Sequence, residues 1–75
     1  MSIDLKQSAE IARGLPKRQR QVLCCLGQGL LAKETAEKLN ISESTVRNTR
    51  TVIYSKLRVN NAIEAVRVAF TAGML

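Results

Sequence analysis

The chain has 75 residues, which is the size of one small domain, and we expect no separate receiver or effector-binding domain. Twelve Lys and Arg against six acids give a net charge of +6, and this excess favours a polyanionic partner, with nucleic acid as the first candidate. Because the chain has no His, we expect it to be no enzyme and to bind no metal or cofactor. It also has no apolar run near the ~20 residues of a membrane span, so we expect no association with a membrane and a cytoplasmic location.

The first helix is predicted over residues 2–12. Ser2 is its expected cap, Asp4 is expected in its opening turn, and Gly14 lies beyond its end. The apolar residues of this stretch are loosely ordered, so its pattern is weaker than those that follow.

The second helix is predicted over residues 16–27. Pro16 suits a helix opening, and Gly27 is expected to end the apolar periodicity. Cys24 and Cys25 are adjacent within this helix, so their side chains diverge and cannot form a disulfide with each other. We interpret both as small core or boundary residues.

A short helix over 31–39, a turn at Asn40 and a longer helix over about 43–57 form a predicted helix-turn-helix unit. Ser42 is a natural cap for the longer helix. Ala36 has a small side chain, which lets the two helices approach closely. The apolar stripe of the longer helix consists of Val46, Ile53 and Leu57.

The last helix is predicted over residues 61–72 and ends at Gly73. Its apolar residues at helical spacing are Ala62, Ala65, Val66 and Ala69. Strand alternation appears nowhere, so the predicted fold class is all-α.

The outward face of the helix over 43–57 has the chemistry of a base-reading surface. At about 100° per residue, the side chains opposite the apolar stripe are Ser44, Arg47, Asn48, Thr51 and Ser55. Arg can bind guanine O6 and N7, Asn can bind adenine N6 and N7, and a Thr methyl can contact a thymine methyl. This face is therefore suited to the DNA major groove.

With these features the chain resembles the LuxR-type, GerE-like helix-turn-helix family over roughly residues 15–75, and residues 1–14 form an N-terminal extension. The matching motifs are Leu15-Pro16-Lys17-Arg18-Gln19-Arg20-Gln21-Val22-Leu23, Gly29-Leu30, Lys33-Glu34, Ala36, Ile41-Ser42-Glu43, Thr45-Val46-Arg47-Asn48, Lys56-Leu57 and Glu64-Ala65-Val66-Arg67. The resemblance implies a four-helix domain whose third helix enters the groove and whose fourth helix forms a dimer contact. The extension would add a further N-terminal helix.

The resemblance also assigns site residues. It implies base contacts at Arg47, Asn48 and Thr51. It implies phosphate contacts at Lys33, Thr45 and Lys56, and dimer packing around Ile63 and Arg67. Several positions depart from the family and indicate a divergent member: Pro16, Gln19, Gln21, Leu31, Ala32, Thr35 and Thr49.

Two assignments have alternatives. Arg50 lies nearer the apolar face, and we expect either a phosphate contact or a local ion pair with Glu43 or Glu37. Phe70, like Ile63, is expected in the dimer interface, although a domain this small could also use both in its core.

The leading hypothesis is a stand-alone, sequence-specific transcriptional regulator that binds double-stranded DNA as a homodimer. Region 4 of a sigma factor has similar motifs, but the predicted helix over 61–72 argues against it. A third hypothesis is a protein-binding antagonist or adaptor that pairs with a full-length LuxR-type regulator or with RNA polymerase.

Overall fold

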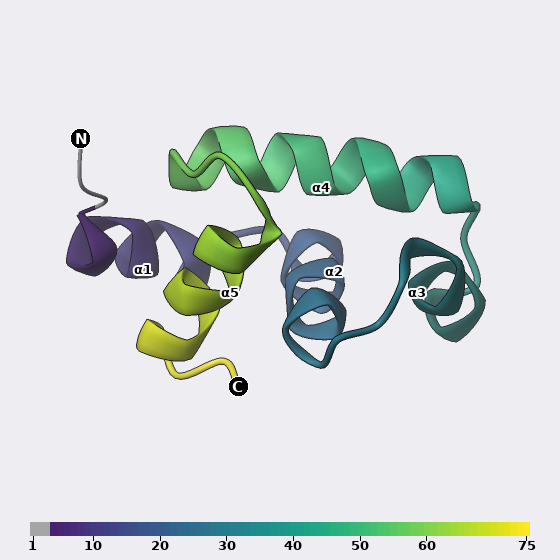
Figure 1. Cartoon of the computed structure of the whole chain (residues 1–75), viewed down its shortest axis with the longest axis horizontal. Helices are drawn as coiled ribbons and strands as arrows, with labels where there is room; N and C mark the ends of the chain where they lie inside the picture. Colours follow the sequence, from purple (N-terminus) through teal and green to yellow (C-terminus); the bar gives the residue numbers. More distant parts are fainter. Residues whose placement is uncertain (1–3) are drawn as a thin grey trace.

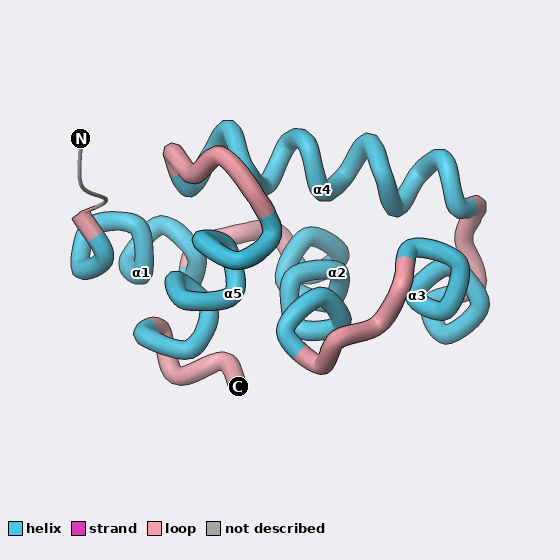
Figure 2. Tube along the Cα trace, viewed as in Figure 1, coloured by secondary structure: helices cyan, strands magenta, loops and turns pink. Residues whose placement is uncertain are grey.

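The computed structural model describes residues 4–75, and this part of the chain is helical and contains no strand (Figures 1 and 2). Its helices are α1 (Leu5–Arg13), α2 (Lys17–Gly27), α3 (Ala32–Leu39), α4 (Glu43–Leu57) and α5 (Ala62–Thr71). The predicted all-α class is confirmed, and α1 is the additional N-terminal helix. The four helices of the expected domain are therefore α2 to α5, with α4 in third place.

Helix α1 begins at Leu5 rather than at residue 2. The carboxylate of Asp4 accepts a hydrogen bond of 3.1 Å from the backbone N–H of Gln7, so Asp4 is the N-cap. The expected place of Asp4 in the opening turn is therefore wrong, because its side chain satisfies a free N–H of that turn. The expected cap Ser2 lies outside the described residues.

Helix α3 begins without a polar side chain at its cap position. Leu31 occupies that position, and its backbone N–H donates to the Glu34 carboxylate at 2.8 Å. Glu34 thus supplies the reciprocal half of a capping box. The start of α3 is held although its cap residue is apolar.

The turn between α3 and α4 is short and tightly hydrogen-bonded. Asn40 adopts a left-handed conformation with φ of 57°, which Asn tolerates better than most residues. The N–H of Ile41 donates to the carbonyl of Ala36 at 3.0 Å. Ser42 then caps α4 by accepting from the N–H of Thr45 at 3.1 Å. The predicted turn and cap are confirmed.

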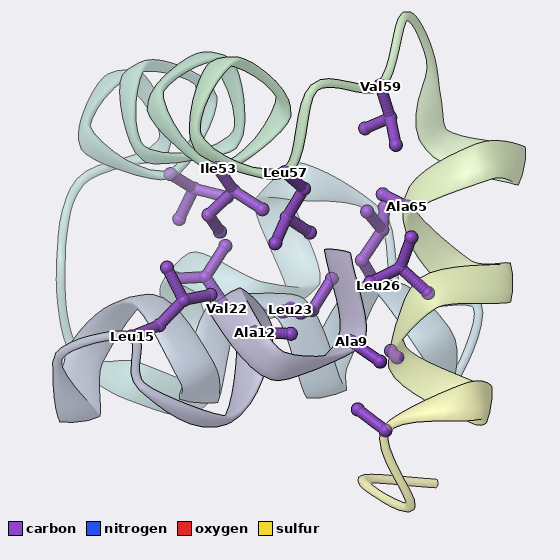
Figure 3. Close-up of a cluster of buried hydrophobic side chains, with 14 of the residues drawn as sticks. Ala9, Ala12, Leu15, Val22, Leu23, Leu26, Ile53, Leu57, Val59 and Ala65 are labelled. Atoms are coloured by element: carbon purple, nitrogen blue, oxygen red, sulfur yellow. The ribbon is translucent and has the colours of Figure 1, made fainter. Parts of the chain in front are cut away.

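The core is aliphatic and is shared by all five helices. The predicted stripe of α4 is fully buried, with no exposed surface on Val46, Ile53 or Leu57. Figure 3 shows Ile53 and Leu57 above side chains of α2, among them Val22 and Leu23. Since these side chains fix the rotation of α4 about its axis, they also determine which α4 residues face outward.

Helix α1 belongs to this same core. Ala9 and Ala12 are buried, and the hydroxyl of Ser8 donates to the carbonyl of Leu57 at 2.8 Å. Arg13 Nε donates to the carbonyl of Ala72 at 3.2 Å. Helix α1 is thereby bonded to the C-terminal ends of both α4 and α5.

The arrangement leaves one long side of α4 uncovered (Figure 1). Helix α3 packs near the N-terminal end of α4, while α1 and α5 pack toward its C-terminal end. In residues 4–75, no helix is both long enough and apolar enough to cross a bilayer.

Candidate nucleic-acid interface

The predicted base-reading residues share the exposed side of α4. Arg47, Asn48 and Thr51 are all exposed, and Ser44 and Ser55 extend the same surface toward the two ends of the helix. Val46, immediately before Arg47, is fully buried. The core therefore holds this stretch of α4 in a fixed orientation while its polar side chains stay accessible.

Arg47 is not isolated on this surface. Its Nη2 lies 2.6 Å from Oε1 of Glu43, one turn earlier on the same helix. The two side chains are 67% and 41% exposed, respectively. A carboxylate thus lies beside the predicted guanine reader, although the outward face appeared free of acids in the sequence. The spacing of Glu and Arg at i and i+4 was the signal for this pair.

The hydroxyl of Thr51 is turned back onto the helix. It donates to the carbonyl of Arg47 at 3.2 Å. This bond leaves the methyl group as the part of the exposed side chain that is suited to a contact with a thymine methyl.

Three of the predicted phosphate-binding residues lie at the start of α3, the start of α4 and the end of α4. Lys33 is exposed in the first turn of α3, and Thr45 is exposed in the first turn of α4, where its hydroxyl lies 2.7 Å from that of Ser42. Lys56 lies in the last turn of α4, and its Nζ donates to Gln19 of α2 at 2.9 Å. Eleven positions separate Thr45 from Lys56, or about 17 Å of helix. These groups therefore do not form one cluster but flank the exposed side of α4.

Arg50 forms neither of the ion pairs considered for it. Its Nη2 donates to the carbonyl of Leu30 at 2.9 Å, and its Nε is buried without a partner among the described residues. The expectation of an ion pair with Glu43 or Glu37 is wrong, because the one salt bridge within residues 4–75 joins Arg47 to Glu43 and the Arg50 guanidinium donates to a backbone carbonyl instead. Arg50 instead ties α4 to the loop that precedes α3.

The residues predicted for a dimer contact lie on the outer side of α5. Ile63 is 75% exposed and Phe70 is 73% exposed, and Arg67 is exposed between them. The alternative that Ile63 and Phe70 serve the core is therefore wrong. Two large apolar side chains at i and i+7 instead form an uncovered strip on one helix face.

The described residues hold no group of three side chains of the types that ligate metals. Both cysteines are free, and Cys25 is buried whereas Cys24 is half-buried. This difference in burial agrees with the interpretation of Cys25 as a core residue and Cys24 as a boundary residue.

Comparison with known proteins places these features in a family. The model of the luxR family of bacterial regulatory proteins, GerE, matches residues 13–69. This match covers α2, α3 and α4 and most of α5.

Several curated proteins are similar over most of the chain. The response regulator protein TmoT of Ectopseudomonas mendocina is 45% identical over 87% of this chain, and the transcriptional regulatory protein FixJ of Azorhizobium caulinodans is 43% identical over 81%. The transcriptional regulatory protein YdfI of Bacillus subtilis is 37% identical over 95%. The matches cover only 28%, 29% and 38% of those three relatives, so the chain corresponds to one part of each.

Proposed function

Because the chain belongs to the luxR family of bacterial regulatory proteins, we propose that it is a sequence-specific regulator of transcription that binds double-stranded DNA. In this proposal α4 enters the major groove, and two copies of the domain pair through α5. The domain acts by binding and performs no catalysis.

The exposed side of α4 is the observation that carries this function. Arg47, Asn48 and Thr51 supply a guanine reader, an adenine reader and a methyl contact on one accessible surface. A helix is the element that the major groove admits, and the buried Val46 keeps this surface directed away from the core.

Phosphate contacts at Lys33, Thr45, Arg50 and Lys56 complete the proposed interface. Contacts of this kind fix the register of a protein on the duplex and make binding salt-dependent. Arg50 is half-buried whereas the other three are exposed, and one of its nitrogens already donates to the Leu30 carbonyl. The net charge of +6 supports the same partner.

Pairing through α5 explains the uncovered Ile63 and Phe70. A symmetric dimer would bury this strip against its own copy and place two α4 helices on the same side of the DNA. The half-sites are then about 10 bp apart, centre to centre.

The same strip also supports a second candidate function. Through Ile63 and Phe70 the chain could pair with another LuxR-type regulator, or contact RNA polymerase, and act as an antagonist or adaptor. The two functions differ in the behaviour of the chain alone, because only the first requires it to bind DNA. A sigma region 4 module is disfavoured by the presence of α5 after the recognition helix.

A gel-shift titration of the purified chain against random duplex at low salt tests the proposal. We expect retarded complexes, followed by enrichment of a two-fold symmetric motif when bound duplexes are selected from a random pool. Absence of any retarded complex would reject the DNA-binding function and leave the antagonist as the remaining candidate.

A further inference from the structure

The carboxylate of Glu43 lies beside the surface that is proposed to read DNA. Its Oε1 is 2.6 Å from Nη2 of Arg47, and no other acceptor binds the Arg47 guanidinium within residues 4–75. This is also the one ion pair that the described part of the chain contains. The one positive charge among the outward residues of α4 is therefore paired with a carboxylate in the free chain.

Glu43 opposes contacts with phosphate. On a random duplex, a contact of Arg47 with phosphate brings the negatively charged phosphate close to the Glu43 carboxylate, whether or not the two side chains stay paired. Unpaired like charges at an interface reduce affinity for the wrong partner. The pair thus weakens the attraction that Arg47 would otherwise offer to every DNA sequence.

A guanine changes this balance. Arg carries five N–H donors in a planar fork, so one edge can bind O6 and N7 while the guanidinium still donates to a carboxylate. Glu43 would then orient the fork instead of competing for it. Guanine offers Arg47 two acceptors without the full negative charge of a phosphate, so the nearby carboxylate does not oppose this contact.

From this geometry we propose that Glu43 is a specificity-determining residue, which suppresses binding to random DNA and aims Arg47 at guanine. This inference rests on the proposed function, because it concerns the same face of α4. It assigns a role to a residue that does not itself contact a base. The carboxylate of Glu43 acts through its pairing with Arg47.

The test is Glu43→Gln, which removes the charge and keeps the size of the side chain. Two probes are used: a random-sequence duplex and the duplex that the wild-type chain selects from a random pool. We expect affinity for the random duplex to rise about two- to fivefold, the range set by one exposed ion pair. The salt slope on that duplex should become steeper by about one. Affinity for the selected duplex should change little, so the ratio of the two affinities falls.

Glu10→Gln is the matched control. Glu10 is exposed on α1, at the far end of the molecule from the start of α4, and the substitution removes the same charge. If net charge alone governed the result, both variants would behave alike. We expect the Glu10 variant to keep the wild-type ratio of selected to random affinity.

A second background isolates the action through Arg47. In an Arg47→Ala chain, Glu43→Gln should no longer lower the ratio of selected to random affinity. If Glu43 only stabilised the first turn of α4, Glu43→Gln would fray the helix and lower the affinity for both duplexes. The proposed role instead raises the affinity for the random duplex.

The outcomes separate this inference from the proposed function. Selective wild-type binding with an unchanged or lower affinity of the Gln variant for random duplex would overturn the role of Glu43 and uphold the DNA-binding function. A wild-type chain that binds neither duplex would overturn both.

Discussion

Ser8 in α1 and Leu57 at the end of α4 are joined by a buried hydrogen bond across 49 positions of sequence. The Ser8 hydroxyl donates to the Leu57 carbonyl at 2.8 Å, and only 4% of Ser8 is exposed. Carbonyls in the last turn of a helix lack an intrahelical donor, so this bond satisfies a group that α4 cannot satisfy itself. The last turn of α4 therefore depends on a residue near the start of the chain.

Ser8→Ala should lower the free energy of unfolding by about 1 to 2 kcal/mol, because it leaves the buried Leu57 carbonyl without its donor. Thermal denaturation followed by circular dichroism measures this change. Ser55→Ala is the control, since Ser55 is exposed on α4. Equal stability of the two variants would show that the bond from Ser8 contributes nothing.

Thr35→Val should stabilise the domain by about 1 kcal/mol. Thr35 is fully buried, and its hydroxyl has no hydrogen-bond partner among the described residues. Burial of such a group costs free energy, and Val replaces the hydroxyl by a methyl of similar size. Urea denaturation gives the difference in the free energy of unfolding. Thr71→Val is the control, because Thr71 is exposed and its hydroxyl donates to the backbone carbonyl of Arg67. A loss of stability in the Thr35 variant would indicate a partner for the hydroxyl.

Ile63→Glu should dissociate the proposed dimer and weaken operator binding together, while the monomer stays helical. The substitution places a charge in the strip of α5 that pairing would bury. Sedimentation velocity reports the mass, and Leu31→Glu is the control because Leu31 is 67% exposed but lies at the start of α3. An unchanged dimer in the Ile63 variant would place the interface elsewhere.

Lys33→Ala and Lys56→Ala should each weaken binding to selected and random duplexes about equally, and each should reduce the salt slope by about one. In the proposed complex, both lysines contact phosphates beside the exposed side of α4, and neither contacts a base. Lys6→Ala, an exposed change on α1, should leave the salt slope as it is. A loss confined to the selected duplex would instead make the lysine a base reader.

Arg47→Ala should cost about 1 to 3 kcal/mol on the selected duplex and relax preference at one base pair in each half-site. Arg47→Lys should restore charge but not the bidentate geometry. Binding of the wild type and both variants to a panel of operator point mutants at fixed salt measures this. A uniform loss across the panel would reduce Arg47 to a phosphate contact and leave base reading to Asn48 and Thr51.

The helices and the exposed side of α4 were predictable because they depend on local periodicity. The spacing of Val46, Ile53 and Leu57 fixes one side of α4 as buried, and the exposure of Arg47, Asn48 and Thr51 follows from it. The Asn40 turn was also predictable, since it uses a residue type suited to its backbone conformation.

The partners of the charged side chains were harder to predict. Arg50 donates to the backbone carbonyl of Leu30, twenty positions earlier, and a carbonyl carries no sequence signal because every residue has one. The start of α1 depends on whether Ser2 or Asp4 caps it, and both residue types are good caps. Residue type alone therefore fixes neither the cap of α1 nor the acceptor that Arg50 binds.

The closed turn between α3 and α4 has a consequence for the thermodynamics of DNA recognition. With Asn40 already left-handed, Ile41 bonded to Ala36 and Ser42 capping α4, the angle between the two helices is set in the free chain. In the proposed complex, docking requires no folding transition of the backbone. The entropy lost on association then comes from the rigid-body freedom of the partners and from the side chains of α4, whereas the released counterions and groove water gain entropy. The heat-capacity change on binding should accordingly be that of rigid-body association. It should be smaller in magnitude than the change for a segment that folds as it binds.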